Sequence, residues 1–376
     1  AILAPGVLPS ARAHTPQPLG CGGGKASGRR PAASRHETEL GPGAARCPHR
    51  VGPEAMAQPG QGAKVLLMGR AFAGKTSMKS IIFANYLARD TNRLHHTNFV
   101  EHSSLRFLGN LRLNLWDCGG QDVFMENYFE SQRENIFQNA EVLIYVIVAV
   151  KGSTDTSKAS PSEGTKDMNY FHHAMESLRQ FSPSARVFCL IHKLDLVHES
   201  KREEVFNNYK RDVMNSAPGM NIQCFGTSIW DETLFKAWSQ IVYSLIPDID
   251  QLQKQLEHIC KVCEADEVVL FEKNTFLLIS HSSRKSMQDS HRFEKISNIV
   301  KQFKLSCAKV KTSFRSFQVK NSLFSATIEP FLQHSFVMVV VSDPQIHQAA
   351  TSANLWAARS HFAELAKAGA PFSHHL

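Results

Sequence analysis

A glycine-bounded loop with the sequence GRAFAGKTS, at residues 69–77, constrains the fold of this chain more than any other stretch. It follows an apolar run at residues 64–68 and precedes a helical pattern at residues 78–87. Strand, loop and helix in this order are the context of a phosphate-binding loop, in which backbone N–H groups hold the oxygens of a polyphosphate. A chance Gly-Lys-Thr turn is the alternative, and the agreement of motif, strand and helix argues against it.

The residue types in this loop indicate its chemistry. Gly69 and Gly74 stand where a side chain would intrude on the phosphates. We expect Lys75 to neutralise the β- and γ-phosphates, and the hydroxyl of Thr76 to ligate Mg²⁺, a cation that prefers oxygen ligands. The predicted nucleotide-binding residues of the loop are Gly69, Ala73, Gly74, Lys75, Thr76 and Ser77.

The motif DCGGQ is the first of two that help to decide between a kinase, an ATPase and a GTPase. It places the carboxylate of Asp117 on the metal side of the site and the backbone N–H of Gly120 beside a γ-phosphate. Gln121 then stands where an amide would orient an attacking water, so we assign catalytic roles to Gln121 and Lys75. A plain glycine turn after a strand is the alternative interpretation.

The motif HKLD, directly after an apolar run at residues 186–191, indicates the base. The carboxylate of Asp195 can accept hydrogen bonds from the ring N–H and the amine of guanine, a pair of donors that adenine lacks. Lys193 would lie along the base. One K-x-D sequence is weak evidence, but the phosphate-binding loop, DCGGQ and HKLD in this order together predict a guanine-nucleotide site. The other predicted contacts at the base end are His192, Thr227, Ser228 and Ile229.

Alternating apolar runs and helical patterns predict an α/β fold around these motifs. Predicted strands lie at residues 64–68, 104–108, 111–117, 142–150, 186–191 and 222–225, and predicted helices at 78–87, 131–138, 167–181, 203–214 and 232–245. Gly109 and Asn110 predict an antiparallel hairpin turn. Residues 151–165, rich in Ser, Thr and Gly, are expected to form a mobile surface loop.

The pattern changes beyond Pro247. Predicted helices lie at residues 249–263, 293–303 and 350–366, and predicted strands at 314–319, 323–329 and 335–341, with two more within 267–280. This order predicts an α+β domain with a mostly antiparallel sheet. The segment carries no motif of its own.

Composition and charge are those of an ordinary soluble globular protein, with 376 residues, 43% hydrophobic and 20% charged. The net charge of +8 would suit a nucleic-acid partner, but about half of the excess lies before Gln61. Residues 1–62 are rich in Gly, Pro, Ala and Arg, and we expect them to be disordered. No apolar run reaches the roughly 20 residues that span a bilayer.

The eight cysteines show no spacing typical of a disulfide framework. Cys118, Cys189 and Cys224 fall in or beside strand-like runs, which favours reduced thiols in a protein core. Cys260 and Cys263 form one C-x-x-C sequence without a second pair at zinc-site spacing. Buried thiols are therefore favoured there over a metal site.

Taken together, the motifs resemble the Rag GTPases of the RagA and RagB type. The resemblance rests on NLWDCGGQD, MENYF, EVLIYV, IHKLDLV, TSIWDETL, EADEVVLFE and HRFEKISNIVKQFKLSC, and it extends over residues 64–367. It implies a Ras-like GTPase domain at residues 63–247 and a roadblock-type dimerisation domain at residues 248–367. Residues 1–62 would be an extension and residues 368–376 a flexible tail.

The resemblance also implies ligands and partners. It implies GTP or GDP with Mg²⁺, ligated by Thr76, by Asp117 and by Thr97 at the position of the family's first switch threonine. His192 matches a histidine that this family has where most small GTPases have asparagine. Hydrolysis should be slow, because no arginine finger is evident in the chain.

The partners implied are a RagC/RagD-type GTPase in a heterodimer, a Ragulator-type lysosomal scaffold, Raptor with the target-of-rapamycin kinase, and a GTPase-activating complex. The heterodimer would relay amino-acid supply. The protein would be cytoplasmic and reach the lysosomal surface through these partners. No nucleic acid is implied, and contact with the membrane would be indirect.

Departures from the family pattern keep a second class of function open. Phe72 replaces a small residue beside the phosphates, and residues 151–165 look like an insertion. The alternative is a nucleotide-impaired scaffold that only forms the heterodimer. An ATPase or kinase is a third possibility, which competition between ATP and GTP would expose.

Overall fold

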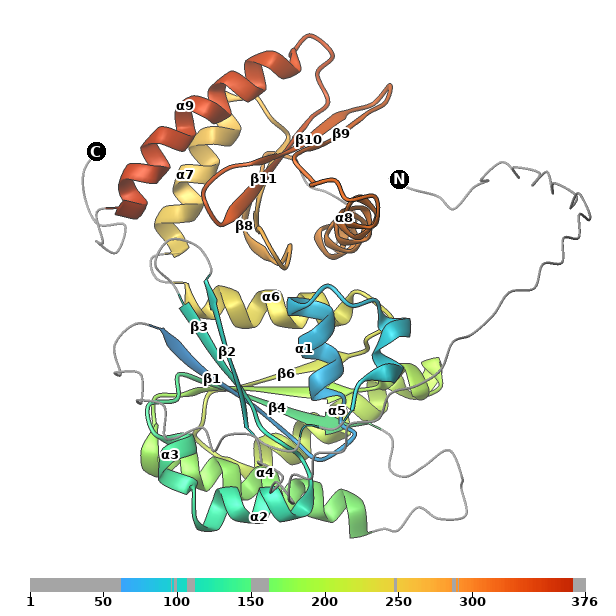
Figure 1. Ribbon diagram of the computed structural model, residues 1–376, viewed down its shortest axis with the longest axis vertical. Helices are drawn as coiled ribbons and strands as arrows, with labels where there is room; N and C mark the ends of the chain where they lie inside the picture. The colour runs from blue at the N-terminus through green and yellow to red at the C-terminus, as the bar shows by residue number, and fades with distance from the viewer. Residues whose placement is uncertain are drawn as a thin grey trace, which may run out of the picture. The chain divides into compact units, whose positions relative to one another are not determined.

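The computed structural model describes residues 62–367, apart from residues 96, 98–99, 107–111, 150–161, 247–248, 286–288 and 290. The tail at 368–376, all but the last residue of the predicted extension, the Gly109-Asn110 turn and most of the predicted loop at 151–165 lie outside these residues. The described residues form two sheets with covering helices, within one compact unit, Pro59–Leu376 (Figure 1).

The first sheet has six strands in the order β2-β3-β1-β4-β5-β6. The strands are β1 (Ala63–Met68), β2 (Glu101–Arg106), β3 (Arg112–Asp117), β4 (Val142–Val148), β5 (Arg186–His192) and β6 (Ile222–Thr227). All neighbours are parallel except β2 and β3, which form the predicted antiparallel pair. The carboxyl ends of the parallel strands therefore bring the loops that follow them to one edge of the sheet.

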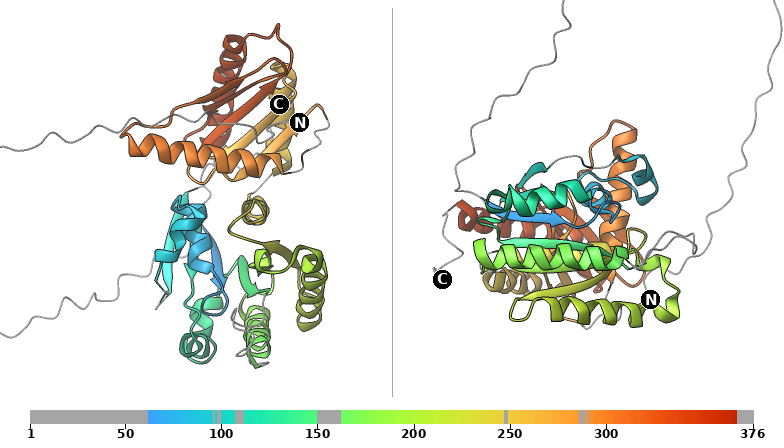
Figure 2. Two further views of the ribbon diagram at one scale, coloured as in Figure 1. Left: turned by 90° about the vertical axis from the view of Figure 1, so that its right-hand side faces the viewer. Right: turned by 90° about the horizontal axis from the view of Figure 1, so that it is seen from below.

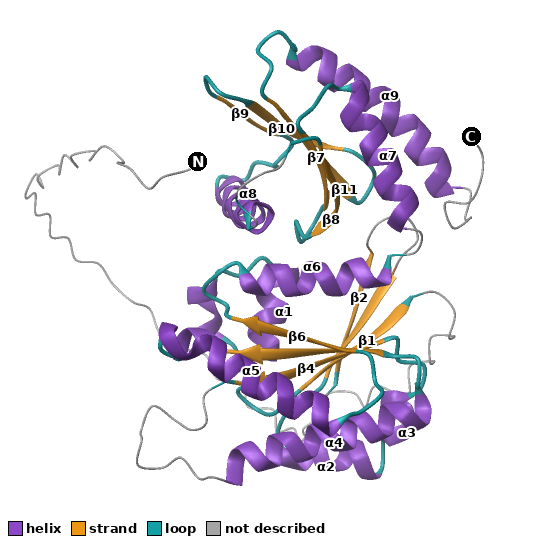
Figure 3. Ribbon diagram, turned by 180° about the vertical axis from the view of Figure 1, so that it is seen from behind, coloured by secondary structure: helices purple, strands orange, loops and turns teal. Residues whose placement is uncertain are grey.

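Helices cover both faces of the first sheet (Figure 3). They are α1 (Lys75–Phe83), α2 (Asp122–Glu130), α3 (Arg133–Phe137), α4 (Ser162–Phe181), α5 (Glu199–Ser216) and α6 (Thr233–Leu245). Along β1, Val65 and Leu67 pack with α1 and α6, whereas Leu66 and Met68 pack with the helices of the opposite face. The two-residue period of a strand thus divides one apolar run between two cores.

Several helix boundaries around the first sheet differ from the sequence prediction. α1 ends at Phe83 rather than at residue 87, and Asn85 then adopts a left-handed backbone with φ of 57°. A 3₁₀ helix, η1 (Ala88–Arg93), follows. The helix expected at residues 131–138 is the shorter α3, and a second helix, α2, begins directly after Gln121. α4 begins at Ser162, inside the segment predicted as a loop.

The second sheet has five strands in the order β8-β7-β11-β10-β9, and every neighbouring pair is antiparallel. The strands are β7 (Glu267–Glu272), β8 (Leu278–Ser283), β9 (Phe317–Lys320), β10 (Ser325–Pro330) and β11 (Ser335–Val341). α7 (Ile249–Val262) and α9 (Gln348–Lys367) pack on one face, and α8 (Arg292–Lys309) packs on the other (Figure 2). The predicted fold class, a Ras-like α/β sheet followed by a roadblock-type α+β sheet, is confirmed.

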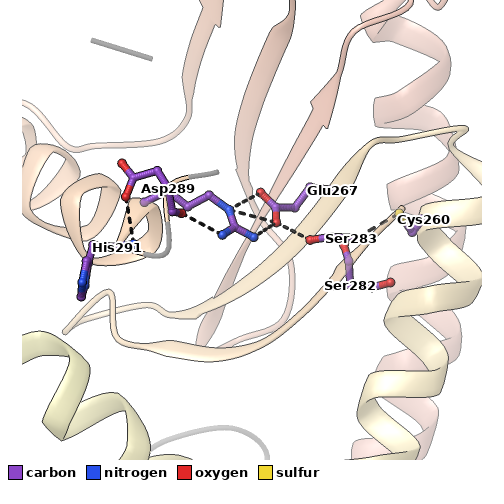
Figure 4. A network of polar contacts seen from close by, with 7 residues as sticks. Cys260, Glu267, Ser282, Ser283, Asp289 and His291 are labelled. Atoms are coloured by element: carbon purple, nitrogen blue, oxygen red, sulfur yellow. Dashed lines mark hydrogen bonds and ion pairs between the residues drawn. The ribbon is translucent and has the colours of Figure 1, made fainter. Parts of the chain in front are cut away.

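A buried polar network attaches the start of α8 to the second sheet (Figure 4). Glu267 of β7 is buried, and Arg292 Nε lies 3.2 Å from each of its carboxylate oxygens. The Ser283 hydroxyl donates to the same carboxylate, and Arg292 Nη1 donates to Asp289 O at 3.0 Å. A bidentate guanidinium compensates the buried charge, so α8 is held in a defined position on the sheet.

The cysteines singled out in the sequence are free thiols. Cys118, Cys189, Cys260 and Cys263 are buried, as predicted, and Cys224 is partly buried. Burial raises the pKa of Cys118 to about 12, so this thiol is protonated at neutral pH. Within the described ranges, no helix is long and apolar enough to cross a membrane.

Candidate functional site

A cavity of about 460 Å³ opens where the loops of the first sheet converge. The predicted site residues that line it are Gly74, Lys75, Thr76, Ser77, Thr97, Gly120, Gln121, His192, Lys193, Asp195 and Ile229. They come from segments that follow β1, β3, β5 and β6 and from the segment before β2. The strand order β3-β1-β4-β5-β6 therefore gathers motifs from distant parts of the sequence around one space.

The loop at residues 69–77 has the backbone that its glycines permit. Gly69 has φ of 138° and Gly74 has φ of 94°, values that L side chains rarely adopt. Lys75 is buried, and its Nζ donates to Gly69 O at 2.6 Å and to Arg70 O at 2.9 Å. Burial lowers the pKa of Lys75 to about 8, against the attraction of Asp117. A buried ammonium is costly without a counter-charge, which an anion such as a phosphate would supply here.

The two hydroxyls predicted to ligate Mg²⁺ lie together, with Thr76 Oγ1 2.8 Å from Thr97 Oγ1. Asp117, at the end of β3, is fully buried, and its Oδ1 has no hydrogen-bond partner within the described residues. The ammonium of Lys79 lies 2.8 Å from Asp117 Oδ2 and also pairs with Glu101. Hydroxyl and carboxylate oxygens are the donors that a hard cation such as Mg²⁺ prefers.

Opposing effects act on the Asp117 carboxyl. Burial raises its pKa and Lys79 lowers it, and the net direction is upward. Burial lowers the pKa of Lys79, but its contacts with Asp117 and Glu101 raise it, and the net direction is again upward. The ion pair therefore helps to hold a buried carboxylate in its charged form.

Gly120 packs directly on the phosphate-binding loop. Ala71 N donates to Gly120 O at 2.6 Å, and a Cβ on Gly120 would lie 2.4 Å from the carbonyl carbon of Arg70. No side chain fits at this position. Gln121, the next residue, lines the cavity at the start of α2.

His192 connects the base end of the cavity to the phosphate-binding loop. Its ring is buried, and Nδ1 lies 3.0 Å from Thr227 Oγ1. A Cβ on Gly74 would lie 2.9 Å from His192 Cδ2, so the ring packs against the loop. Burial lowers the pKa of His192 to about 4, and the imidazole is neutral at pH 7.

Lys193 makes a second connection to the loop. Its backbone is left-handed, with φ of 62°, and its Nζ donates to Phe72 O at 2.7 Å. Phe72 lines the rim of the cavity and is 78% exposed. Most of this side chain is therefore in solvent, which leaves room for phosphates in the loop.

The predicted contacts after β6 divide into two groups. Ile229 lines the cavity, whereas Thr227 and Ser228 are buried and do not line it. Ser228 N donates to Thr233 Oγ1 at 2.9 Å, and Ser228 Oγ accepts from Trp230 N at 3.0 Å. The backbone N–H of Ser228, predicted to touch the base, is thus engaged within the turn before α6.

Gly69, Ala73 and Asp117 are the other predicted site residues that do not line the cavity. Gly69 contributes the carbonyl that Lys75 contacts, and Ala73 is buried within the loop. Asp117 is buried at the end of β3, where Lys79 of α1 pairs with it. These residues support the lining rather than form its surface.

Sequence reasoning missed several residues that line the cavity. They are Ala88, Thr91, Asn92, Leu94, His95, Leu196 and Trp230. The residues around η1 show no clear periodicity in the sequence, so no pattern indicated them. Trp230 is 63% exposed and lies two residues beyond a predicted contact, Ser228. An aromatic residue so close to the predicted base contacts could have indicated this part of the cavity.

Comparison with known proteins agrees with the motifs. Residues 64–300 match the Gtr1/RagA G protein conserved region. The chain is 51% identical over 336 residues to Ras-related GTP-binding protein B of Rattus norvegicus, covering 82% of this chain and 87% of that protein. It is 54% identical over 299 residues to Ras-related GTP-binding protein A of Dictyostelium discoideum, covering 80% of this chain and 96% of that protein.

A more distant similarity joins this chain to a second type of relative. Over 229 residues the chain is 24% identical to Ras-related GTP-binding protein C of Mus musculus, covering 58% of this chain and 53% of that protein. The chain is therefore about twice as similar in sequence to the A and B type as to the C type.

Proposed function

The chain belongs to the Gtr1/RagA family of G proteins, and on this premise we propose that it is a switch that binds GTP and GDP with Mg²⁺ and hydrolyses GTP slowly. The observation that carries the proposal is the convergence of Lys75, Gln121 and Asp195 on one cavity. These residues would neutralise phosphate, orient water and select guanine, respectively.

The phosphate end supports this assignment. Lys75 would exchange the carbonyls of Gly69 and Arg70 for phosphate oxygens, because an anion compensates a buried ammonium better than neutral carbonyls do. Thr76, Thr97 and Asp117 would hold Mg²⁺, which when bound neutralises charge on the phosphates. Within the described residues, no arginine lines the cavity. Transition-state charge would therefore need stabilisation from a GTPase-activating partner.

The nucleotide-impaired scaffold remains the rival proposal, and the exposure of Phe72 speaks against it. Titration of the full chain with a fluorescent GDP analogue in Mg²⁺ distinguishes the two. Saturable binding displaced by GTP and GDP, but not by equal concentrations of ATP, is expected of the switch. Absence of saturable binding would favour the scaffold, and displacement by ATP would favour an ATPase or kinase.

The second sheet carries the support for a partner subunit. On α8, Ile299 and Phe303 are large apolar residues that remain exposed, and Val319 on the edge strand β9 is exposed as well. Exposed apolar side chains beside an unpaired strand edge are typical of an association surface. We place a RagC/RagD-type GTPase there, with residues 248–367 as the dimerisation domain and residues 63–247 as the GTPase domain.

The same proposal extends to the cellular role. The heterodimer would act from the cytoplasm at the lysosomal surface, on a Ragulator-type scaffold, and relay amino-acid sufficiency to Raptor and the target-of-rapamycin kinase. Co-purification with a RagC-type subunit, followed by chromatography of the bound nucleotide, tests partner and ligand in one experiment. Recovery of the pair without guanine nucleotide would support the proposed heterodimer and refute the proposal of a nucleotide-dependent switch.

A further inference from the structure

Lys301 of α8, on the second sheet, donates hydrogen bonds to a helix of the first. It is 4% exposed, and its Nζ lies 3.0 Å from Ile82 O and 3.2 Å from Ile81 O. Both carbonyls belong to the last turn of α1, where a helix has no internal donor for its carbonyl groups. The amine therefore satisfies groups that would otherwise be buried without partners, at the negative end of the helix dipole.

A second group of the first sheet's helices also contacts the Lys301 amine. The ring of Phe235, on α6, lies 4.6 Å from Nζ, within the range of a cation–π interaction. Burial, with a smaller effect of Lys304, lowers the pKa of Lys301 to about 7 against the attraction of Glu272. A neutral amine keeps two N–H donors for the two carbonyls. Both hydrogen bonds therefore persist in either protonation state.

Apolar packing continues across the same boundary. Ile81 and Ile82 share a buried cluster with Leu277, the residue before β8. Leu278 N, in β8, donates to Ser239 Oγ, on α6, at 3.3 Å. The first and second sheets are thus joined by a packed contact, and Lys301 contributes its buried amine to it.

α1 leads from this contact to the candidate nucleotide cavity. Thr76, in its first turn, lines the cavity, and Ile82, in its last turn, accepts from Lys301. The two residues are six positions apart, about 9 Å along a helix axis at 1.5 Å per residue. A short helix moves as one element, so a displacement at its first turn changes the contacts at its last.

We propose that Lys301 is a positioning residue that couples occupancy of the nucleotide cavity to α8, acting through α1. This inference rests on the proposed function, because guanine nucleotide is the ligand whose binding is relayed. Coupling is reciprocal, so whatever holds α8 also changes nucleotide affinity. α8 carries the exposed Ile299 and Phe303, so nucleotide occupancy would be reported on the proposed partner surface.

Hydrogen-exchange mass spectrometry of the full chain, with and without GDP and Mg²⁺, tests the coupling. Lys301→Met removes the amine and retains most of the volume. Lys304→Met is the matched control, because Lys304 Nζ donates to Lys273 O at 2.9 Å and Asn274 O at 3.3 Å, in the turn between β7 and β8. Thermal melts verify that each variant folds.

In the wild type and in Lys304→Met, nucleotide should change the exchange rates of α8 by about fivefold or more, the lower end of typical coupling. Lys301→Met should keep the change in the loop at residues 69–77 and lose most of the change in α8. In the wild type, α8 should respond more than α7 and α9, which pack on the opposite face of the second sheet. That comparison tests the inference even where Lys301→Met does not fold.

Each remaining outcome has a defined meaning. An α8 response that survives in a folded Lys301→Met overturns the inference, as does an equal loss in Lys304→Met or an equal response of α7 and α9. Protection of the loop without any response in α8 overturns the inference and retains the proposed function. Absence of any nucleotide effect on the loop overturns both.

Discussion

The hydroxyl of Thr76 lies 2.8 Å from that of Thr97, although the two residues are 21 positions apart in the sequence. Thr76 lies in the first turn of α1, and Thr97 lies in the segment before β2. Both residues line the cavity, so their contact places two hydroxyl oxygens together at its phosphate end.

Thr76→Asn should weaken Mg²⁺-dependent GTP binding by at least about tenfold, because the amide cannot reproduce the hydroxyl as a compact metal ligand. The fold should persist, since Thr76 is only partly buried. Titration with fluorescent GTP, in Mg²⁺ and in a chelator, measures the effect. Thr76→Ser keeps the hydroxyl and should bind like the wild type; equal loss in both variants would contradict a metal role.

Asp195→Asn should shift base preference from guanine toward xanthine, because the amide offers a donor where the xanthine carbonyl requires one. Asp195 lines the cavity beside Lys193. Competition of GTP and XTP against a fluorescent nucleotide gives the ratio of affinities, which should change by about tenfold or more for a charged hydrogen-bonding pair. An unchanged affinity for GTP would remove Asp195 from the base-binding site.

Asp167→Asn should flatten the pH dependence of stability. Burial raises the pKa of Asp167 to about 6 from 3.8, opposed by Arg70, and Tyr145 Oη lies 3.2 Å from its carboxylate. A raised folded-state pKa means that this stabilisation is complete below about pH 4 and is lost as pH rises through 6, by about 3 kcal/mol in all. The variant should therefore gain stability at pH 7.5 and lose the slope between pH 4 and 6.

Urea unfolding across that pH range measures the free energy of unfolding for wild type and Asp167→Asn. Asp212→Asn, at an exposed carboxyl on α5, is the matched control for the removal of one carboxylate. A slope that survives in Asp167→Asn would assign the pH dependence to other groups.

Ile299→Asp should abolish pairing with a RagC-type subunit and leave the chain folded. Ile299 is 42% exposed on α8, so the carboxylate remains hydrated in the free chain but would be buried without a partner in the complex. Trp356→Asp, at a residue of α9 that is 68% exposed, is the control on the other face of the sheet. Co-purification and a thermal melt measure pairing and folding; equal effects would place the interface elsewhere.

Local patterns in the sequence were sufficient for most of the fold. Apolar runs predicted the strands of both sheets, because buried strands carry apolar side chains at consecutive or alternating positions. They did not predict α2, in which only Met125 and Tyr128 are buried, because two buried positions are too few to give a clear helical period. They also did not indicate η1, because its apolar residues recur with no regular spacing. Residues of η1 line the cavity.

By itself the sequence determined the chemistry of the motifs and the backbone of the phosphate-binding loop. Gly69 and Gly74 permit positive φ angles at their own positions, which is a local effect. Only the tertiary structure decided which groups meet. The contact of Thr76 with Thr97, the pairing of Lys79 with Asp117 and the reach of Lys301 to α1 depend on strand order and helix packing. Such contacts join segments that the chain separates by tens to hundreds of residues, so no local pattern encodes them.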